Sequence, residues 1–461
     1  MPKRIESDSI GSLEVEENAY YGVQSLRAKR NFPITGRRVL DIFNKNLALI
    51  KKACCMTNEE AGLLSEEKAN AIIQACDEIM EGKFRDHFIT DPLQGGAGTS
   101  FNMNMNEVIA NRADEILGGK LGCYEYVHPN DDVNMAQSTN DVIPTAGKMT
   151  ALVLLDGLIE ELRRLHSALL VKAIDFKDVL KMGRTQLQDA VPMTLGNTFE
   201  SYATMVERCL ERIESSSKEM TVINLGGTAI GSKINASLYY EENIAKKLTD
   251  LFHREMKQAT DLFDATENLD SFAEVSGSMK ALSVSLSKMC NDLRLLSSGP
   301  RCGFNEINLP PMQNGSSIMP GKVNPVIPEV VTQACYLVIG HDTTIALACE
   351  AGQMELNAFE PVIFDQLFES ILVLTNSIRT LIDHCIVGIQ ANKEHCLELE
   401  KSSLGIVTAL NPFLGYKKSA YIAKKAVKEK KSIEEVVLEE KIMDKKTLEY
   451  ILNQAVEESE K

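Results

Sequence analysis

Regularly spaced leucines constrain the fold of this chain more than any other feature. They recur at alternating intervals of three and four residues, at Leu155, Leu158, Leu162, Leu165 and Leu169. This spacing places all of them along one side of an α-helix, and such a side must pack against other helices, as in a bundle or coiled coil. The leucines are therefore predicted to be core residues.

Helical sequence continues from Val142 to about Ile389. Short polar interruptions divide it near residues 181–190, 224–236, 260–268, 300–325 and 350–361. No alternating or β-branched stretch predicts a sheet. We therefore predict a mainly α fold whose central domain is a bundle of about five long helices, the kind of domain that commonly packs with other subunits.

The flanking segments have a different character. We place residues 1–140 in an N-terminal, mainly helical domain, 141–391 in the central long-helix bundle and 392–461 in a small C-terminal helical domain. Apolar residues between Asn46 and Glu81 predict two helices. A lysine-rich run from Lys417 to Lys431 predicts a helix with a solvated face.

Composition excludes several classes of partner. The net charge of −16 argues against nucleic acid. Nothing at the N-terminus marks the chain for secretion, and no window approaches the roughly 18 uninterrupted apolar residues of a membrane span. The eleven cysteines are scattered and the seven histidines show no metal-ligand spacing. We therefore expect a cytoplasmic protein with reduced thiols, no metal site and no membrane partner.

One interruption contains the run GSSIMPGKVNPVIPEV, which starts at Gly315. Its glycines and prolines exclude a regular helix or strand, and Asn324 before Pro325 predicts a helix beginning just beyond. A loop with two serines, a lysine and an asparagine beside a helix N-terminus suits a carboxylate or a phosphate. Phosphate is the weaker alternative, because Val323 stands where a nucleotide-binding loop has a magnesium-binding Ser or Thr. The other alternative is an ordinary surface loop with a helix cap and no ligand.

Further polar segments share this composition, at Gly98–Ser100, Gln137–Asp141 and Lys181–Gln188. All are predicted to lie at helix N-termini, where backbone N–H groups and small hydroxyls can bind an anion. Taken singly, such Ser and Thr residues are most often helix caps. If the segments converge with the loop at Gly315, they form a pocket of neutral donors with one lysine, which suits carboxylates.

Taken together, the motifs resemble those of the fumarase/aspartase superfamily. The loop GSSIMPGKVNP is similar to its signature, and GGAGTS, HPND with QSTND, GRTQLQDAVPMTLG, GGTAIGSKIN and VTALNP agree in order and spacing. Within the superfamily, AYYGVQSLRA and KVNPVIPEVV are most similar to the aspartate ammonia-lyases. The resemblance spans nearly the whole chain. It implies a three-domain fold with a tetrameric helical core, and a homotetramer whose active sites are each shared by three subunits.

The resemblance also implies a reaction. L-Aspartate would be deaminated reversibly to fumarate and ammonia by anti elimination, through an enediolate (aci-carboxylate) intermediate and without a cofactor, although activation by a divalent cation is not readable from the sequence. The implied catalytic residues are Ser316, acting as an alkoxide base, and Lys322. The implied substrate contacts are Thr99, Ser138, Thr139 and Ser317 around the β-carboxylate, Lys322, Asn324 and Thr185 at the α-carboxylate, Asn140 at the amino group, and Gln186 as an orienting residue.

A serine base needs activation, for which Lys322 and the N–H groups of a closed loop are candidates. Gln186 stands where many members, including fumarases, have a histidine that pairs with a glutamate at the position of Glu329. A neutral glutamine cannot form that relay, which favours an ammonia-lyase and leaves the general acid unassigned. His128 in HPND and Glu306 in FNEINLP stay open between structural and functional roles.

Two alternatives to an ammonia-lyase come from the same resemblance. The nearer is a class II fumarate hydratase acting on malate and fumarate. The other is a catalytically silent structural homologue, since lens crystallins derive from this superfamily. The complete set of Ser316, Lys322, Asn324 and Thr99 argues against a silent protein.

Overall fold

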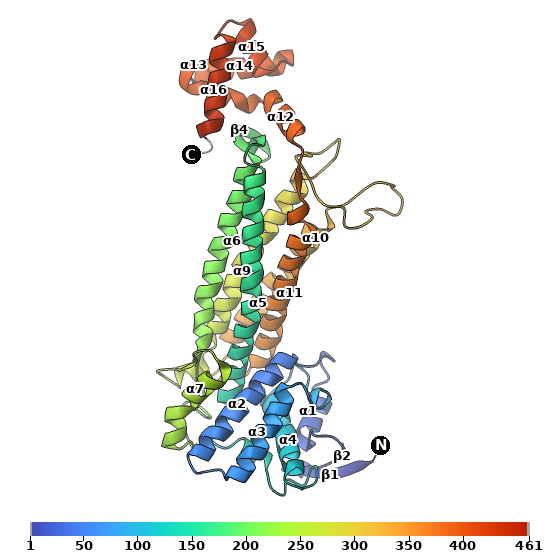
Figure 1. The fold of residues 1–461 in the computed structure, drawn as a ribbon, viewed down its shortest axis with the longest axis vertical. Coiled ribbons are helices and arrows are strands. Elements are labelled where there is room, and N and C mark those ends of the chain that lie inside the picture. The colour runs from blue at the N-terminus through green and yellow to red at the C-terminus, as the bar shows by residue number, and fades with distance from the viewer. Residues whose placement is uncertain (1, 459–461) are drawn as a thin grey trace. The chain divides into compact units, whose positions relative to one another are not determined.

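The computed structural model describes residues 2–458 and confirms a mainly helical protein. Figure 1 shows the long helices of the predicted bundle. Among the described residues, the longest are α5 (Thr139–Asp175), α6 (Leu195–Ser217), α9 (Asp270–Leu296), α10 (Val326–Glu350) and α11 (Glu360–His384). The predicted polar interruptions fall between them. The five regularly spaced leucines, all in α5, are buried, with at most 1% of each exposed, so their predicted place in the core is confirmed.

The chain packs as two compact units. Unit 1 comprises Met1–Leu158, Arg212–Ala281 and Leu337–Val373, and unit 2 comprises Ile159–Glu211, Leu282–Tyr336 and Leu374–Lys461. The division into domains 1–140, 141–391 and 392–461 stays a prediction.

Unit 1 contains the two helices predicted between Asn46 and Glu81, as α2 and α3. Apart from its parts of the long helices, its elements are β1 (Lys3–Asp8), β2 (Gly11–Glu16), α1 (Val23–Asn31), α2 (Asp41–Glu60), α3 (Glu66–Met80), η1 (Arg85–His87), α4 (Thr99–Ile116), η2 (Pro129–Val133), η3 (Lys218–Thr221), β5 (Val222–Ile223), α7 (Leu238–Phe252), β6 (Lys257–Gln258) and α8 (Asp264–Glu267).

Phenylalanines from several helices form part of the core of unit 1. Phe43 of α2 packs edge-on against Phe101 of α4, with 5.4 Å between ring centroids. Phe364 and Phe368 of α11 stack on each other and lie against Phe43. Burying one such side chain contributes about 1.5–3 kcal/mol, so this cluster fixes α2 and α4 on the long helices of the same unit.

Unit 2 contains a β-hairpin and a group of short C-terminal helices. Apart from its parts of the long helices, its elements are β3 (Leu180–Thr185), β4 (Gln188–Thr194), β7 (Ile307–Asn308), η4 (Ile386–Gly388), β8 (Gln390–Ala391), α12 (Lys393–Ser402), η5 (Leu404–Ile406), α13 (Val407–Leu414), α14 (Tyr416–Glu429), α15 (Ile433–Glu439) and α16 (Lys445–Glu458). The lysine-rich helix predicted from Lys417 to Lys431 is α14. Its apolar side packs into a core formed by Ile422, Ala426, Leu410, Val436 and Leu448.

The described chain has small sheets that the sequence did not predict, each of two strands. The pairs are β1–β2, β3–β4 and β7–β8, which are antiparallel, and β5–β6, which is parallel. In β1 and β2 charged and polar residues dominate, and Val15 lies in a small core cluster of its own. Such strands lack the β-branched, half-buried pattern on which a strand prediction depends.

The prediction that Lys181–Gln188 lies at a helix N-terminus is wrong. This segment forms β3 and the turn into β4, where Gln186 and Leu187 have φ of 52° and 63°. Two consecutive left-handed residues make a tight two-residue hairpin turn. Pro192, a residue type that suits the first turn of a helix, instead pairs with Met182 within the hairpin. Thr185 and Gln186 therefore lie at an exposed hairpin tip.

Within the described part of the chain, two helices meet the length and hydropathy of a membrane span, Thr139–Asp175 and Glu360–Gly388. In the first, 72% of the most apolar window is buried within the structure; in the second, 39% is buried. Core helices of soluble proteins meet the same criteria, so these helices do not by themselves indicate a membrane protein.

Candidate active site

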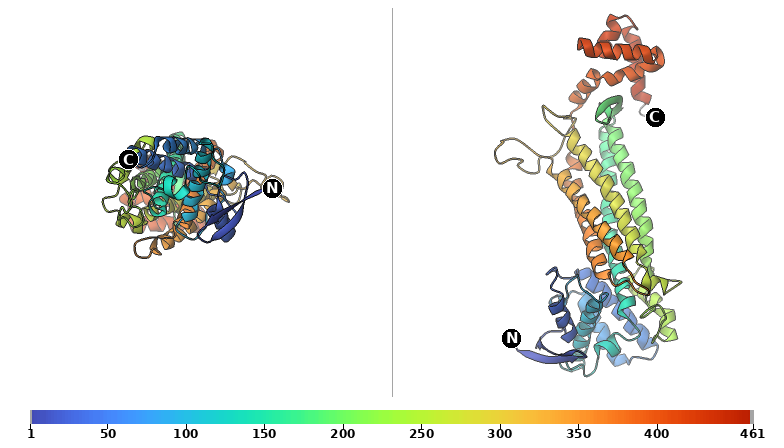
Figure 2. Two further views of the ribbon diagram at one scale, coloured as in Figure 1. Left: turned by 90° about the horizontal axis from the view of Figure 1, so that it is seen from below. Right: turned by 180° about the vertical axis from the view of Figure 1, so that it is seen from behind.

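The loop with the run GSSIMPGKVNP connects β7 to α10 and extends away from the neighbouring helix (Figures 1 and 2). Two hydrogen bonds close its base: the Gly315 amide donates to the Lys322 carbonyl at 3.0 Å, and the side-chain Nδ2 of Asn324 donates to the Gly315 carbonyl at 2.8 Å. A Cβ at position 315 would lie 2.3 Å from the Lys322 carbonyl oxygen. Glycine is therefore required there, and α10 begins just beyond Asn324, as predicted.

Ser316 has its hydroxyl oxygen surrounded by backbone donors. Ser316 Oγ accepts from the amides of Ile318 at 3.2 Å and Met319 at 3.0 Å. Two N–H groups aimed at one oxygen stabilise negative charge on it, as donors do in an oxyanion hole. The loop thus supplies the type of activation that a serine base requires.

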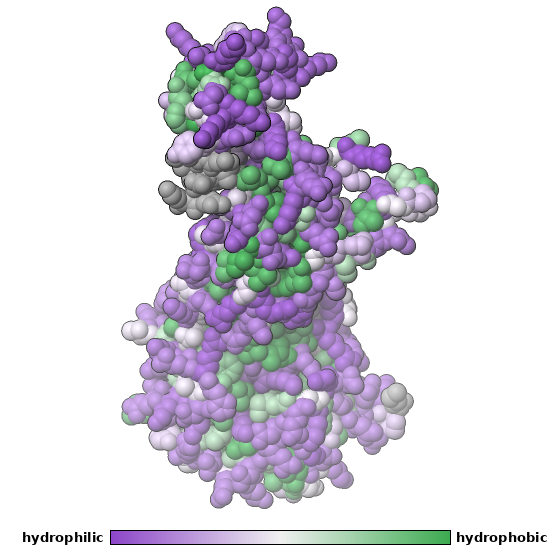
Figure 3. All heavy atoms as spheres, turned by 45° about the horizontal axis from the view of Figure 1, so that its top comes forward, coloured by the Kyte–Doolittle hydropathy of each residue, from purple (hydrophilic) through white to green (hydrophobic). Residues whose placement is uncertain are grey.

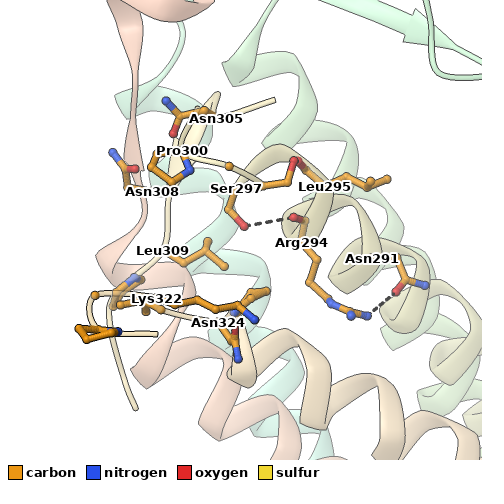
Figure 4. A pocket seen from close by; sticks show the side chains of 17 residues that line it. Asn291, Arg294, Leu295, Ser297, Pro300, Asn305, Asn308, Leu309, Lys322 and Asn324 are labelled. Atoms are coloured by element: carbon orange, nitrogen blue, oxygen red, sulfur yellow. Dashed lines mark hydrogen bonds between the residues drawn. The ribbon is translucent and has the colours of Figure 1, made fainter. Parts of the chain in front are cut away.

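Lys322 lies at the other end of the loop and is exposed. Together with Asn324 it lines a hollow of about 1000 Å³, whose other wall includes Asn291 and Arg294 near the end of α9 (Figure 4). Both cationic side chains face the hollow from unit 2, so this end of the loop favours an anionic group.

A second group of predicted residues lies in unit 1, where α4 and α5 begin. Thr99 is the first residue of α4 and Thr139 the first of α5. Asn102 Nδ2 of α4 donates to Thr139 Oγ1 at 3.2 Å, which joins the two helix starts. Gly98 precedes α4 with φ of 79°, and a Cβ there would lie 2.8 Å from Ile143 of α5. The two N-termini are thereby held close together.

Thr99, Ser138 and Thr139 form a hydroxyl cluster, in which two of the hydroxyl oxygens accept from nearby N–H groups. Ser138 Oγ accepts from the Asn140 amide at 3.2 Å, and Thr139 Oγ1 accepts from Asn102. Because both oxygens already accept from the protein, their O–H groups are free to donate. Donating hydroxyls at helix N-termini are suited to a carboxylate.

Asn140 has its amide orientation fixed. Its Nδ2 donates to the Ala229 carbonyl at 2.8 Å, and the backbone carbonyl of Asn140 accepts from Asn224 Nδ2 at 2.9 Å. The side-chain oxygen of Asn140 is left as an acceptor, which suits a group that donates protons, such as an ammonium.

Asp141 supports the candidate site from within the core, and the sequence did not single it out. It is fully buried and accepts from the amides of Ser138 at 2.9 Å, Gly226 at 3.1 Å and Thr228 at 3.0 Å. Burial raises the pKa of Asp141 to about 6. The carboxylate ties the GGTAIG segment to the start of α5. Both motifs are visible in the sequence, but the bond between them depends on tertiary structure.

Glu306 anchors the hairpin that carries Thr185 and Gln186. Its carboxylate is fully buried and forms ion pairs with Lys181 and Arg184. The Arg184 guanidinium also lies over the Phe304 ring, 4.5 Å from its centroid. These contacts favour the anchoring role among the two that were left open for Glu306.

His128 acts as a helix cap. Its Nδ1 accepts from the amides of Asn130 and Asp131, both at 3.3 Å, at the start of η2. No cluster of three or more His, Cys, Asp or Glu side chains suited to a metal ion lies within residues 2–458.

The predicted residues thus fall into two groups. Thr99, Ser138, Thr139 and Asn140 are brought together in unit 1. Unit 2 carries the others, on its loop (Ser316, Ser317, Lys322 and Asn324) and on its hairpin (Thr185 and Gln186).

Family models match most of the chain. The model described as Lyase matches residues 11–340, and the model described as Fumarase C C-terminus matches residues 406–455.

Curated relatives are similar over nearly their full length. The aspartate ammonia-lyase of Helicobacter pylori (strain ATCC 700392 / 26695) is 52% identical over 97% of this chain and 96% of its own. That of Escherichia coli (strain K12) is 47% identical over 98% of this chain and 95% of its own.

Solved structures agree with this similarity. A fumarate lyase:delta crystallin from Brucella melitensis, solved bound to cobalt, is 45% identical, with a TM-score of 0.95 over 98% of this chain and 99% of that one. A class II fumarase from Schistosoma mansoni is 34% identical, with a TM-score of 0.95 over 98% of both chains. From its motifs, its fold and these relatives, the chain belongs to the fumarase/aspartase superfamily of lyases and, within it, to the aspartate ammonia-lyases.

Proposed function

We propose that this protein deaminates L-aspartate reversibly to fumarate and ammonia. The observation that carries the proposal is the environment of Ser316, whose hydroxyl oxygen accepts two backbone N–H bonds. An alkoxide at this position is stabilised by donors that need no rearrangement during the reaction. Ser316 takes the proton from the β-carbon of aspartate, the electron pair moves into the β-carboxylate to form the enediolate, and ammonia then leaves.

The charge that develops on the β-carboxylate needs donors. Thr99, Ser138 and Thr139 supply hydroxyls at two helix N-termini, and Ser317 supplies another from the loop. Such charge-assisted bonds strengthen as the enediolate forms, which lowers the barrier for proton removal.

The rest of the substrate is held by groups of complementary charge. Lys322, Asn324 and Thr185 bind the α-carboxylate, and the free Oδ1 of Asn140 accepts from the amino group. Gln186, at the hairpin tip, orients the substrate. The reaction requires no cofactor.

We also propose a homotetramer in which three chains share each active site. α10 supports association, because its exposed side carries Val330, Tyr336, Leu337 and Leu347, which are 43–64% exposed. Exposed hydrophobic side chains also gather over the long helices in the view of Figure 3. A contiguous apolar helix face is typical of a buried subunit interface. The solution mass tests this directly: a fully active monomer would contradict shared sites.

We propose that the enzyme acts in the cytoplasm. Nine of its eleven cysteines are buried or partly buried, and none of the eleven is in a disulfide in the described residues, as expected of a protein kept in reducing conditions.

Replacement of Ser316 tests the mechanism. Ser316→Ala removes the base and is expected to leave less than about 1% of the turnover, because a positioned base contributes on the order of 10²–10⁴-fold. The variant should still bind succinate, a dicarboxylate with no amino group to eliminate. A folded variant that retains more than a few per cent of the turnover would exclude Ser316 as the base.

A class II fumarate hydratase is the second candidate, because the Schistosoma mansoni fumarase is similar along the whole chain. Gln186 favours the ammonia-lyase, since a hydratase must manage the protons of a water molecule and a neutral amide does not exchange protons. Activity on L-aspartate compared with L-malate separates the two.

A further inference from the structure

A lysine is fully buried beneath the hydroxyl cluster of unit 1. Lys51 of α2 has no exposed surface and ranks among the largest fully buried side chains of the described chain. A buried ammonium is costly unless its hydrogen bonds are made. Its position therefore requires a reason in the structure around it.

The Lys51 ammonium binds two side-chain oxygens of the segment that leads into α5. Lys51 Nζ donates to Asn134 Oδ1 at 3.0 Å and to Gln137 Oε1 at 2.8 Å. Gln137 Nε2 in turn donates to the carbonyls of Val133 and Met135, and Asn134 Nδ2 donates to the Gln137 carbonyl. The side-chain oxygens of Asn134 and Gln137 face the lysine, and their side-chain nitrogens face backbone carbonyls. These hydrogen bonds fix the orientation of both side-chain amides.

Two routes connect the ammonium to the hydroxyl cluster. Gln137 is followed directly by Ser138 in the chain. Asn134 Oδ1 also accepts from Asn102 Nδ2 at 3.0 Å, and the same Asn102 nitrogen donates to Thr139 Oγ1. Lys51 thus fixes the backbone before Ser138 and the amide that holds the Thr139 hydroxyl.

We propose that Lys51 is a positioning residue of the ammonia-lyase reaction, which holds Asn134 and Gln137 so that Ser138 and Thr139 donate to the substrate β-carboxylate. The proposal rests on the proposed function. Lys51 does not touch the substrate; its bonds reach the segment before α5 directly and α4 through Asn102. Preorganised donors of this kind are effective because they do not reorient as charge develops.

Other titratable groups face Lys51 from the elements around it. These are Cys54 of α2, Cys76 of α3 and Asp141 of α5. Burial lowers the pKa of Lys51 to about 8, raises the pKa of Cys54 to about 12, raises that of Cys76 well above its usual value, and raises that of Asp141 to about 6. Between pH 7 and pH 10, Lys51 is the member of this group that changes charge.

Lys51→Met is the direct test, with Lys52→Met as the matched control. Lys52 is the next residue of α2, but it pairs with Asp77 at 2.6 Å and does not contact Asn134 or Gln137. We expect Lys51→Met to lower kcat/KM for L-aspartate by about 10-fold or more, since two bonds from a charged donor are lost. Lys52→Met should stay within about 2-fold, as is usual for a partly exposed ion pair.

A purely structural role would not predict a pH effect on ligand binding. Succinate stays a dianion between pH 7 and pH 10, so its inhibition constant reports on the protein alone. In the parent, succinate binding should weaken as the pH rises through about 8 and Lys51 loses its proton. In Lys51→Met binding should be weaker throughout and lack this step. Equal kcat/KM in parent and variant, or a step that persists in the variant, would overturn the proposal.

If Lys51→Met does not fold, Asn134→Ala provides the test. This variant keeps the lysine and removes the oxygen that it shares with Asn102. Weaker succinate binding is expected, and unchanged binding would overturn the proposal. If the parent forms no fumarate from aspartate, the proposed function fails, whereas succinate binding by calorimetry still tests Lys51.

Discussion

The signature loop of unit 2, residues 315–324, and the hydroxyl cluster of unit 1 both present hydroxyl groups. Different kinds of contact hold these hydroxyl groups in place. Ser316 lies on an extended loop, where mainly backbone hydrogen bonds determine its surroundings. Ser138 and Thr139 lie over fully buried polar side chains, with Lys51 and Asp141 beneath them. The binding groups are therefore tied to a buried polar core, whereas the proposed base is carried by a largely exposed loop. We expect loop substitutions to affect activity alone and cluster substitutions to affect stability as well.

Gly315→Ala should have the largest effect on activity while leaving stability almost unchanged. Its Cβ would collide with the Lys322 carbonyl and displace Ser316, and a misplacement of about 1 Å can cost roughly 100-fold in rate. We expect this loss in kcat/KM with an almost unchanged unfolding temperature. Gly340→Ala in α10 is the control, since its backbone is helical and no atom lies within 4 Å of the added carbon. Equal activity of the two variants would contradict the role given to the closed base.

Asp141→Ala should do the reverse and destabilise unit 1. It leaves the buried amides of Ser138, Gly226 and Thr228 without their acceptor, which should lower the free energy of unfolding by at least about 3 kcal/mol. Urea unfolding measures this change. Asp141→Asn keeps one acceptor oxygen and should lose less. If both variants are as stable as Gly315→Ala, the contrast between the two regions is wrong.

Asn102→Leu should weaken substrate binding by a smaller factor. It removes the bond to Thr139, worth about 1 kcal/mol, so KM for aspartate should rise about 5-fold. Asn106 is the matched control, because Asn106 Nδ2 also donates to Asn134 Oδ1 and forms no bond to Thr139. Asn106→Leu should therefore raise KM less. Steady-state kinetics of the two variants would show whether the Thr139 contact matters.

Acidic pH should produce the smallest effect. Asp141 takes up a proton as the pH falls through about 6, and a protonated carboxyl accepts poorly from three amides. Folding raises this pKa, so the folded state binds the proton more tightly and protonation does not reduce stability. We expect kcat/KM to decline below about pH 6 without a lower unfolding temperature, and we expect Asp141→Asn to lack this decline.

Much of the fold was predictable because helical periodicity is local. The buried leucines of α5 and the lysine-rich α14 follow directly from residue spacing. The hairpin that carries Gln186 was not predictable from the sequence, because its turn depends on two left-handed residues that are not glycine. Pro192 in the same region favours a helix start by its residue type, but it lies in a strand of the hairpin.

The motifs in the sequence made the candidate site predictable, but they did not reveal the buried residues that support it. Ser316 and Thr139 stand in recognisable segments, whereas Asp141 and Lys51 act through contacts with distant parts of the chain. A lysine in a helix is normally assigned to the surface, and no pattern in α2 marks Lys51 as fully buried. Tertiary packing alone determines which charged residues lie beneath the site.

Elimination of ammonia from L-aspartate distinguishes this enzyme from a fumarate hydratase. Fumarate formation by the purified protein from L-aspartate and from L-malate can be measured in parallel, by absorbance and under the same conditions. We expect clearly faster turnover of L-aspartate. Faster turnover of L-malate would exclude the ammonia-lyase and identify a hydratase.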